Sequence, residues 1–282
     1  MPVNWPRVTD VNAVLVAELV AAGIERREAR WLVEEFVLGG DLDTVPALNA
    51  AARRRLEGEP LQYIIGHWPF RSLDLDLDSR VLIPRPETEE LVGAALQELA
   101  KGGVVAPTIL DLGCGSGAIG LALLDELRSR GIVATLVAVD ESLEALEVAR
   151  RNALKHQLHA VSFVHSSWFA DVDESLQGHV DLVVANPPYV GDVEFAHLDR
   201  VLTYEPRDAI VAPDAQGVAG FADLEVIINE ARRWLTPEGI LLCEHGSEHR
   251  DAVVAAATSA GFTSVEDLDD LSGRPRLLVA RR

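Results

Sequence analysis

The segment Asn186-Pro187-Pro188-Tyr189 carries groups that could grip an amino group. It follows an apolar run, residues 180–185, that is typical of a buried strand. Two prolines cannot continue a sheet ladder, so the strand is expected to end there and a stiff loop to begin. A carboxamide, fixed backbone carbonyls and an aromatic ring offer acceptors and a stacking surface for a planar –NH2 group. Because open α/β sheets bind ligands at the carboxyl ends of strands, this loop indicates chemistry at an amide or amine nitrogen.

A glycine-rich turn, Asp111 to Gly117, joins an earlier strand to a helix. Its glycines let the backbone turn sharply and let a ligand approach closely, and the amides at a helix start favour a negative group. A nucleotide-like cofactor is therefore predicted here, although a plain tight turn is the alternative. The residues concerned are Gly113, Cys114, Gly115, Ser116 and Gly117. They do not choose the cofactor, because Gly115-x-Gly117-x-x-Gly120 also satisfies a dinucleotide fingerprint.

Two further strand ends carry candidate cofactor contacts. Asp140 ends the next predicted strand, where a carboxylate can accept hydrogen bonds from both ribose hydroxyls or, more plainly, cap a helix. Trp168 follows the strand after that, and its indole could flank an adenine or simply pack. Both residues would serve NAD or S-adenosylmethionine.

The loop at Asn186 separates these two cofactors. Hydride transfer has no use for a carboxamide and a carbonyl aimed at an amino group, whereas methylation of a planar nitrogen does. The lone pair of such a nitrogen is delocalised, which makes it a poor nucleophile. Acceptors on both N–H bonds let the lone pair turn toward an electrophilic methyl group, and such alignment can lower a barrier by several kcal/mol. S-adenosylmethionine is the cofactor that we predict.

These residues require a sheet that gathers strand ends at one edge. From about residue 107, short apolar runs alternate with amphipathic segments, which indicates an α/β fold with a mostly parallel sheet and helices on both faces. The predicted strands are 108–112, 133–139, 161–165, 180–185, 239–243, 263–268 and 276–280, and the predicted helices are 87–99, 118–129, 142–156, 224–235 and 251–260. No helix separates the last two strands, so we expect them to pair antiparallel.

Residues from about 9 to 60 are predicted to be helical, with Gly39-Gly40 ending the second helix and a third helix over 45–56. Leu73 to Asp78 alternates apolar and acidic residues, as a half-buried strand does. Three parts are therefore expected: an N-terminal helical domain over 1–68, a linking β-hairpin over 69–84, and the α/β domain over 85–282.

Composition argues against several functions. The 282 residues carry a formal net charge of −20, whereas wide contact with nucleic acid needs a basic surface. Two cysteines, Cys114 and Cys243, form no disulfide framework and fit a reducing cytoplasm. The amino terminus lacks a signal-peptide pattern, and no apolar run reaches the roughly 18 residues of a membrane span. His245 and His249 lack a third ligand, so no metal is predicted, and the acidic run 266–270 is expected to be a solvated face.

Together these residues resemble the HemK/PrmC family, the protein-(glutamine-N5) methyltransferases that modify peptide-chain release factors. Besides the two motifs, the likeness rests on four strings: Gly58 to Gly66, Val81 to Glu89 (the most family-specific), Leu241 to Gly246, and Gly273 to Arg276, together with Glu205-Pro206. The resemblance covers nearly the whole chain. It implies a helical N-terminal domain, a hairpin and a seven-stranded S-adenosylmethionine-dependent methyltransferase domain.

The resemblance also implies roles for individual residues. Gly113 to Gly117 would wrap the methionine part of S-adenosylmethionine, Asp140 would hold its ribose, and Trp168 would lie beside its adenine. Asn186 and the Pro187 carbonyl would bind the glutamine amide, with Pro188 beside them and Tyr189 packing against it. Arg85 and Thr88 would line the same cleft. The stretch from Glu34 to Ala51 is short for the family, whose helical domain helps to dock the release factor.

The preferred hypothesis is a monomer that methylates the glutamine in the Gly-Gly-Gln motif of release factors. A glutamine of a ribosomal protein is a close alternative. An adenine or guanine amino group of nucleic acid is another, because a loop of this type also serves base flipping, but the acidic charge counts against direct nucleic-acid binding. An NAD-dependent oxidoreductase and a non-catalytic binding module complete the alternatives. No membrane contact is expected.

Overall fold

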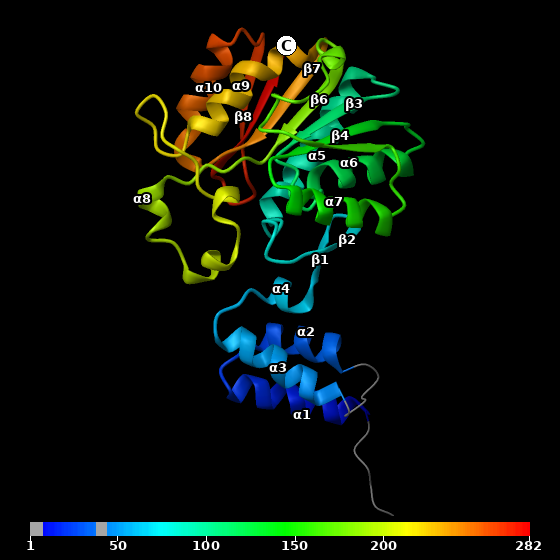
Figure 1. Cartoon of the computed structure of the whole chain (residues 1–282), viewed down its shortest axis with the longest axis vertical. Coiled ribbons are helices and arrows are strands. Elements are labelled where there is room, and N and C mark those ends of the chain that lie inside the picture. Colours follow the sequence, from blue (N-terminus) through cyan, green and yellow to red (C-terminus); the bar gives the residue numbers. More distant parts are fainter. Residues whose placement is uncertain (1–7, 38–43) are drawn as a thin grey trace, which may run out of the picture. The chain divides into compact units, whose positions relative to one another are not determined.

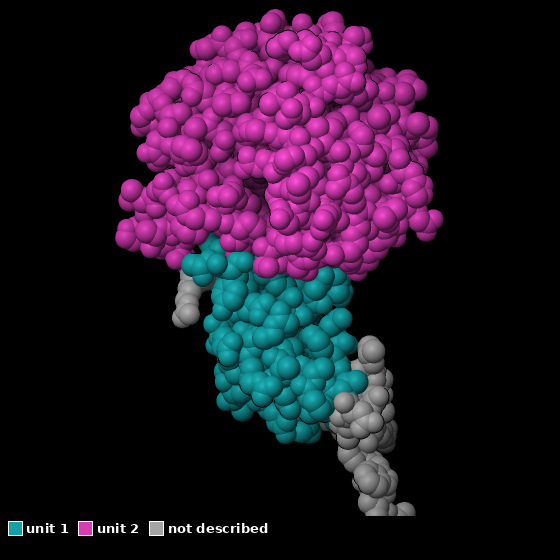
Figure 2. All heavy atoms as spheres, viewed as in Figure 1, with its two compact units in different colours: residues 1–68, 200–204 teal, residues 69–199, 205–282 magenta. Residues whose placement is uncertain are grey.

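The computed structural model describes residues 8–37 and 44–282 (Figure 1). The chain divides into two compact units, coloured separately in Figure 2. Unit 1 comprises residues 1–68 and 200–204, and unit 2 comprises residues 69–199 and 205–282. The predicted helix stop at Gly39-Gly40, and part of the stretch that is short for the family, lie outside the described residues.

Unit 1 is helical, as predicted. Its helices are α1 (Val8–Ala21), α2 (Arg26–Phe36), α3 (Val45–Leu56) and α4 (Leu61–Ile65). Buried side chains from all four, including Leu19, Leu32, Leu48 and Ile64, form a small core. The short helix α4 was not predicted; it ends at Gly66, whose left-handed φ of 87° stops the helix.

A hairpin, β1 (His67–Phe70) and β2 (Leu73–Asp76), follows in the chain. Leu73 and Leu75 are buried while the intervening aspartates are partly exposed, so the predicted alternation is confirmed. The side chain of Asn152 holds β2 from the next layer: its Oδ1 accepts from Asp76 N at 2.7 Å, and its Nδ2 donates to Asp76 O at 3.1 Å and Ser116 O at 2.9 Å. One buried amide therefore ties the hairpin to the glycine-rich turn.

Unit 2 contains the predicted seven-stranded sheet, in the order β5-β4-β3-β6-β7-β9-β8. The strands are β3 (Thr108–Leu112), β4 (Thr135–Asp140), β5 (Val161–His165), β6 (Val180–Ala185), β7 (Leu235–Glu244), β8 (Ser264–Asp269) and β9 (Pro275–Arg281). β9 pairs antiparallel with both β7 and β8, and the other pairs are parallel. β7 begins four residues earlier than predicted, because Leu235 pairs with Val180 across a register shift.

Helices cover both faces of the sheet (Figure 1). One face carries α5 (Pro86–Gly102), α6 (Ala118–Ser129) and α7 (Leu143–Lys155), and the other carries α9 (Ala222–Trp234) and α10 (Arg250–Ser259). The connections also include α8 (Asp192–Phe195), η3 (Glu174–Leu176), η4 (Arg200–Tyr204), η5 (Arg207–Ala209) and η6 (Ser247–His249). Among the described residues no helix is long and apolar enough to cross a membrane.

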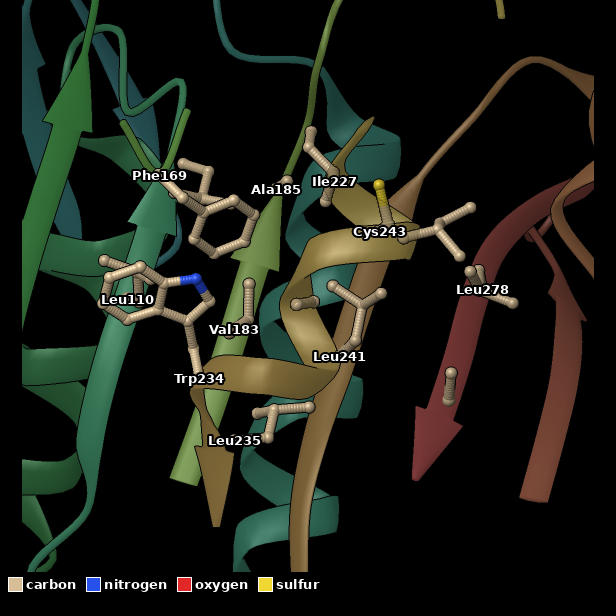
Figure 3. Close-up of a cluster of buried hydrophobic side chains, with 14 of the residues drawn as sticks. Leu110, Phe169, Val183, Ala185, Ile227, Trp234, Leu235, Leu241, Cys243 and Leu278 are labelled. Carbon is tan, nitrogen blue, oxygen red and sulfur yellow. The ribbon is translucent and has the colours of Figure 1, made fainter. Parts of the chain in front are cut away.

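The core beneath α9 makes the strand ends rigid (Figure 3). Leu110, Val183 and Leu241 project from three neighbouring strands toward Ile227 and Trp234 of α9, which are buried with them. The ring of Phe169 stacks on Trp234 with centroids 5.5 Å apart. Burial of each such side chain contributes about 1.5–3 kcal/mol, which fixes the positions of the loops that follow the strands.

Sheet register aligns the chemically interesting residues. Leu112 pairs with both Val139 and Ala185, and Ala185 pairs with Cys243. The residues that follow this paired row are Gly113, Asp140, Asn186 and Glu244. The strand order changes direction between β3 and β6, and ligands of open α/β sheets bind beside such a switch point.

Candidate active site

A cavity of about 790 Å³ opens at the carboxyl ends of the parallel strands. Its lining includes Asp140 from the end of β4, and Gly113, Gly115, Trp168, Asn186 and Pro188 from the loops after β3, β5 and β6. Its volume lies within the range of about 300–1,000 Å³ that is usual for small-ligand sites. Gly113 and Asn186, 73 positions apart in the chain, therefore share one site because their strands are adjacent.

The glycine-rich turn has the backbone shape that its sequence predicted. Gly113, Gly115 and Gly117 have φ values of 67°, 54° and 83°, in the left-handed region that favours glycine. A Cβ on Gly115 would stand in open space, so the backbone itself faces the cavity. Cys114 and Ser116 are buried instead, and the Cys114 amide donates to Val139 O at 2.8 Å. These two side chains shape the turn from within rather than lining the cavity.

Asp140 braces the same turn. Its Oδ2 accepts from the amide of Gly115 at 2.8 Å and its Oδ1 from that of Ser142 at 2.9 Å. The helix cap that was an alternative role belongs to Ser142, whose hydroxyl accepts from Ala145 N at 3.1 Å. Burial raises the pKa of Asp140, and the two backbone hydrogen bonds oppose that rise. Each carboxylate oxygen keeps a second lone pair for a ligand hydroxyl.

Trp168 closes another wall of the cavity. Its ring lies over the turn, since a Cβ on Gly113 would stand 3.3 Å from the indole. The residue has a φ of 50°, a conformation that costs a non-glycine residue about 1 kcal/mol or more. The indole Nε1 donates to Asp223 Oδ1 at 3.1 Å, which holds the ring in place. Asp223, at the start of α9, was not identified from the sequence.

A chain of hydrogen bonds lies behind Asn186. Its Nδ2 donates to Thr88 Oγ1 at 3.2 Å, and the Thr88 hydroxyl donates to Glu244 Oε2 at 2.8 Å. The phenol of Tyr189 donates to Glu244 Oε1 at 3.4 Å, and Arg276 Nη1 donates to that phenol oxygen at 3.4 Å. Thr88 and Glu244 are buried, so the loop after β6 is tied to α5, β7 and β9.

Glu244 is the most prominent residue to which the sequence analysis gave no role, although it lies in the family string Leu241 to Gly246. Burial raises its pKa to about 6, with a further rise from Glu87, while the Thr88 hydroxyl and Arg276 lower it. Burial and the Glu244 charge in turn raise the pKa of Tyr189. The available signal was positional: Glu244 directly follows the apolar residues 239–243, at the same sheet edge as Asn186.

The loop after β6 is also fixed through its backbone. Val190 exchanges hydrogen bonds of 3.0 Å with Ile210 O and Ala212 N. Gly220 has a φ of 65°, and a Cβ there would stand 2.3 Å from the carbonyl oxygen of Tyr189. Pro187 is buried, whereas Pro188 lines the cavity.

Arg85 is held away from the cavity lining. Its Nη2 lies 2.6 Å from Oε1 of Glu205, a buried carboxylate that also accepts from Ile83 N at 2.9 Å. Thr88 does not line the cavity either, but supports it through Asn186. Glu205 was noticed only as part of a family string, and its role in holding residues 83–85 comes from the structure.

One expectation about the acidic run 266–270 is wrong. Asp267 and Asp270 are not solvated: their side chains are 5% and 4% exposed. Asp267 Oδ2 lies 2.7 Å from Nε2 of the buried His245, and Asp270 Oδ1 accepts from Arg274 N at 3.0 Å. The first pairing joins residues 22 positions apart that follow or belong to different strands, whereas the second lies within the turn between β8 and β9, whose folding buries Asp270. Among the described residues no group of His, Cys, Asp and Glu could hold a metal ion.

The charges around the cavity distinguish between NAD and S-adenosylmethionine. Six carboxylate side chains and two guanidinium groups line it. The Gly115 amide, which a dinucleotide pyrophosphate would use at this helix start, is already bound to Asp140. A pyrophosphate would meet net negative charge here, whereas the sulfonium and amino groups of S-adenosylmethionine would meet an attractive field. The charge of the lining therefore fits S-adenosylmethionine better than a dinucleotide: Gly113 and Gly115 would lie along its methionine part, Asp140 at its ribose and Trp168 beside its adenine.

Comparison with known proteins also indicates a methyltransferase. A family model described as a methyltransferase domain matches residues 105–270. The fold is similar to that of the T. thermophilus 16S rRNA N2 G1207 methyltransferase in complex with AdoMet and guanosine, with a TM-score of 0.55 and 17% identity over 77% of this chain and 49% of that one. Fold and cavity thus define an S-adenosylmethionine-dependent methyltransferase.

Sequence relatives narrow the class. The chain is 39% identical to a release factor glutamine methyltransferase from Coxiella burnetii, over 83% of this chain and 79% of the relative. It is 36% identical to another protein of that name from Bifidobacterium longum, over 95% of this chain and 90% of the relative. The chain belongs to the release factor glutamine methyltransferase family, which confirms the resemblance seen in the sequence.

Proposed function

We propose that this protein transfers a methyl group from S-adenosylmethionine to the side-chain amide nitrogen, N5, of the glutamine in the Gly-Gly-Gln motif of peptide-chain release factors. Family membership supports the reaction and the substrate. The observation that carries the proposal is the placement of Asn186, which follows β6, lines the cavity and is held from behind by Thr88.

The residues of the loop after β6 position the substrate. Asn186 Oδ1 and the Pro187 carbonyl accept hydrogen bonds from the two N–H groups of the glutamine amide, and Tyr189 packs against that amide. S-adenosylmethionine supplies an electrophilic methyl group. With both N–H bonds held, the nitrogen lone pair turns out of conjugation toward the methyl group, an alignment that can lower a barrier by several kcal/mol. A strong base is not required, because a methylated amide nitrogen sheds its extra proton readily.

Charge supports a protein substrate over a nucleic acid. A net charge of −20 and six carboxylates at the cavity oppose a polyphosphate backbone. A release factor that presents a basic surface to ribosomal RNA would instead be attracted to this enzyme. We assign the enzyme to the cytoplasm, where release factors act, as a monomer that makes no direct contact with nucleic acid or membrane.

We propose that the N-terminal domain, residues 1–68, docks the release factor, and that residues 69–84 link it to a catalytic domain over 85–282. Val14 and Leu56 have apolar side chains that are 56% and 49% exposed, so both are accessible to a protein partner. Val14→Asp should raise KM for the whole release factor without changing kcat. An unchanged KM for Val14→Asp and for Leu56→Asp would argue against docking through these residues.

Incubation with tritiated S-adenosylmethionine tests the reaction. The substrates are purified release factors with the motif glutamine intact or replaced by alanine, a ribosomal protein extract, and DNA and RNA. The proposal expects label only on the intact release factor, with one added methyl group on the motif glutamine by mass spectrometry. Label on a ribosomal protein or on nucleic acid would reassign the substrate.

A further inference from the structure

Thr88 and Glu244 lie behind Asn186, and the reaction proposed above assigns them no task. Thr88 stands in the first turn of α5 and Glu244 is the last residue of β7, 156 positions later. Both are buried, 3% and 2% exposed, and the hydrogen bond between them is short at 2.8 Å. A buried carboxylate carries a desolvation cost, so its presence at this position calls for a reason.

The direction of the hydrogen bonds explains why a buried carboxylate stands at this position. An ionised carboxylate can only accept, and a threonine hydroxyl has a single hydrogen to donate. When Thr88 gives that hydrogen to Glu244, its oxygen can only accept from Asn186. The carboxamide of Asn186 must then turn its NH2 toward Thr88, as it does at 3.2 Å. Its Oδ1 is left for the substrate.

The opposite orientation would defeat the site. The two ends of a carboxamide have nearly the same shape, so hydrogen bonding alone distinguishes them. A flipped Asn186 would present N–H donors to a substrate amide that also donates. It would also take the Thr88 hydrogen, leaving the buried Glu244 oxygen without that partner.

We propose that ionised Glu244, acting through the hydroxyl of Thr88, fixes the carboxamide of Asn186 with its oxygen toward the substrate amide. The inference rests on the proposed function and makes both residues positioning residues. Protonation of Glu244 would let it donate to Thr88, whose hydrogen could then go to Asn186 Oδ1, and the preferred orientation would be lost. The groups that face Glu244 are Arg276 from β9, Tyr189 from the loop after β6, and Glu87 with Thr88 from α5. Glu244 also borders a second cavity of about 540 Å³, shared with Glu87, Asp270 and Arg276, through which protons can reach it.

The first test compares two substitutions at Thr88. Thr88→Val removes the hydroxyl at constant shape, and Thr88→Ser keeps it. Thr88→Val should lower kcat roughly 5- to 100-fold, the scale of a lost buried hydrogen bond, with unchanged cofactor affinity by calorimetry. Thr88→Ser should restore most of that rate. A merely structural role for Thr88 would leave the serine variant as impaired as the valine variant, which would overturn the proposal.

The second test is the pH profile of kcat at saturating cofactor. The wild-type rate should rise through about pH 6 to a plateau, because burial places the pKa of Glu244 there. Glu244→Gln should have a lower kcat on the plateau and should lack the rise through pH 6. The double variant Glu244→Gln/Thr88→Val should have a kcat only slightly below that of Glu244→Gln. Glu98→Gln is the matched control. Glu98 is also a buried, paired carboxylate, and it lies in α5 about 15 Å along the helix from Thr88, at 1.5 Å per residue. This variant should keep the wild-type rate and pH profile. A rise through pH 6 that persists in Glu244→Gln would refute the role of Glu244. Absence of transfer by the wild type would instead count against the proposed function.

Discussion

The amide of Gly115 donates to Oδ2 of Asp140 across 2.8 Å, which joins the turn after β3 to the end of β4. This single bond shapes the cofactor site in two ways. It holds the left-handed turn open toward the cavity, and it occupies the amide that would otherwise invite a phosphate. A cationic cofactor is favoured over a dinucleotide as a result.

Replacing Asp140 should therefore weaken cofactor binding. Asp140→Ala removes the predicted ribose acceptor and leaves the Gly115 and Ser142 amides without their partner. We expect Kd for S-adenosylmethionine to rise about 10- to 100-fold, the cost of one or two charge-assisted hydrogen bonds. Isothermal titration calorimetry measures this directly. An unchanged Kd would contradict the ribose role.

Asn186→Ala should separate chemistry from cofactor binding. The change removes the acceptor that aligns the substrate amide, and we expect methyl transfer to fall about 100-fold or more while cofactor Kd stays within a few-fold. Transfer is followed with labelled cofactor on the purified release factor. Full methyl-transfer activity in this variant would contradict the positioning mechanism.

Gly220 should be intolerant of a side chain. In Gly220→Ala the new Cβ would stand 2.3 Å from Tyr189 O, so the loop after β6 must shift. We expect a loss of about 1–3 kcal/mol of stability and at least a tenfold loss of kcat. Gly217→Ala is the matched control, because Gly217 has a φ of 77° but nothing within 4 Å of its added Cβ. Equal effects in the two variants would show that backbone strain alone is responsible.

Asp111 should make stability depend on pH. It is fully buried beside α6, accepts from Gly120 N at 2.9 Å, and has a pKa raised by burial to about 7. Its unfolded pKa is about 3.9, so the folded state binds the proton more tightly and stability falls as pH rises from about 4 to 7. Asp111→Asn cannot ionise and keeps an acceptor for Gly120. It should gain up to about 4 kcal/mol over the wild type at pH 8, because one pKa unit corresponds to about 1.36 kcal/mol, and little at pH 4. Urea unfolding at both pH values checks this, and a pH-independent difference would rule out the explanation.

Local sequence patterns predicted most of the helices and strands, and they selected residues that the structure brings together at one cavity. The strand 108–112, the helix 118–129 and the strands 161–165 and 180–185 have the predicted bounds, because apolar periodicity and glycine or proline breaks act within a few residues. Gly113, Gly115, Asp140, Trp168 and Asn186 meet at one cavity, since parallel strands present their carboxyl ends at one edge.

The sequence by itself determined the fold class and the methyl donor and predicted the acceptor loop, because the patterns and motifs that indicate them are local. Tertiary structure alone decided which groups support them: Glu244 behind Thr88, Glu205 under Arg85, Asp223 beneath Trp168, and Asp267 against His245. Their partners lie from 22 to 156 positions away. From sequence alone, a carboxylate is expected to be solvated at the surface. In the folded protein, packing can remove its water and replace it with a polar partner from elsewhere in the chain. That exchange is a property of the packed fold, and no window of neighbouring residues contains it.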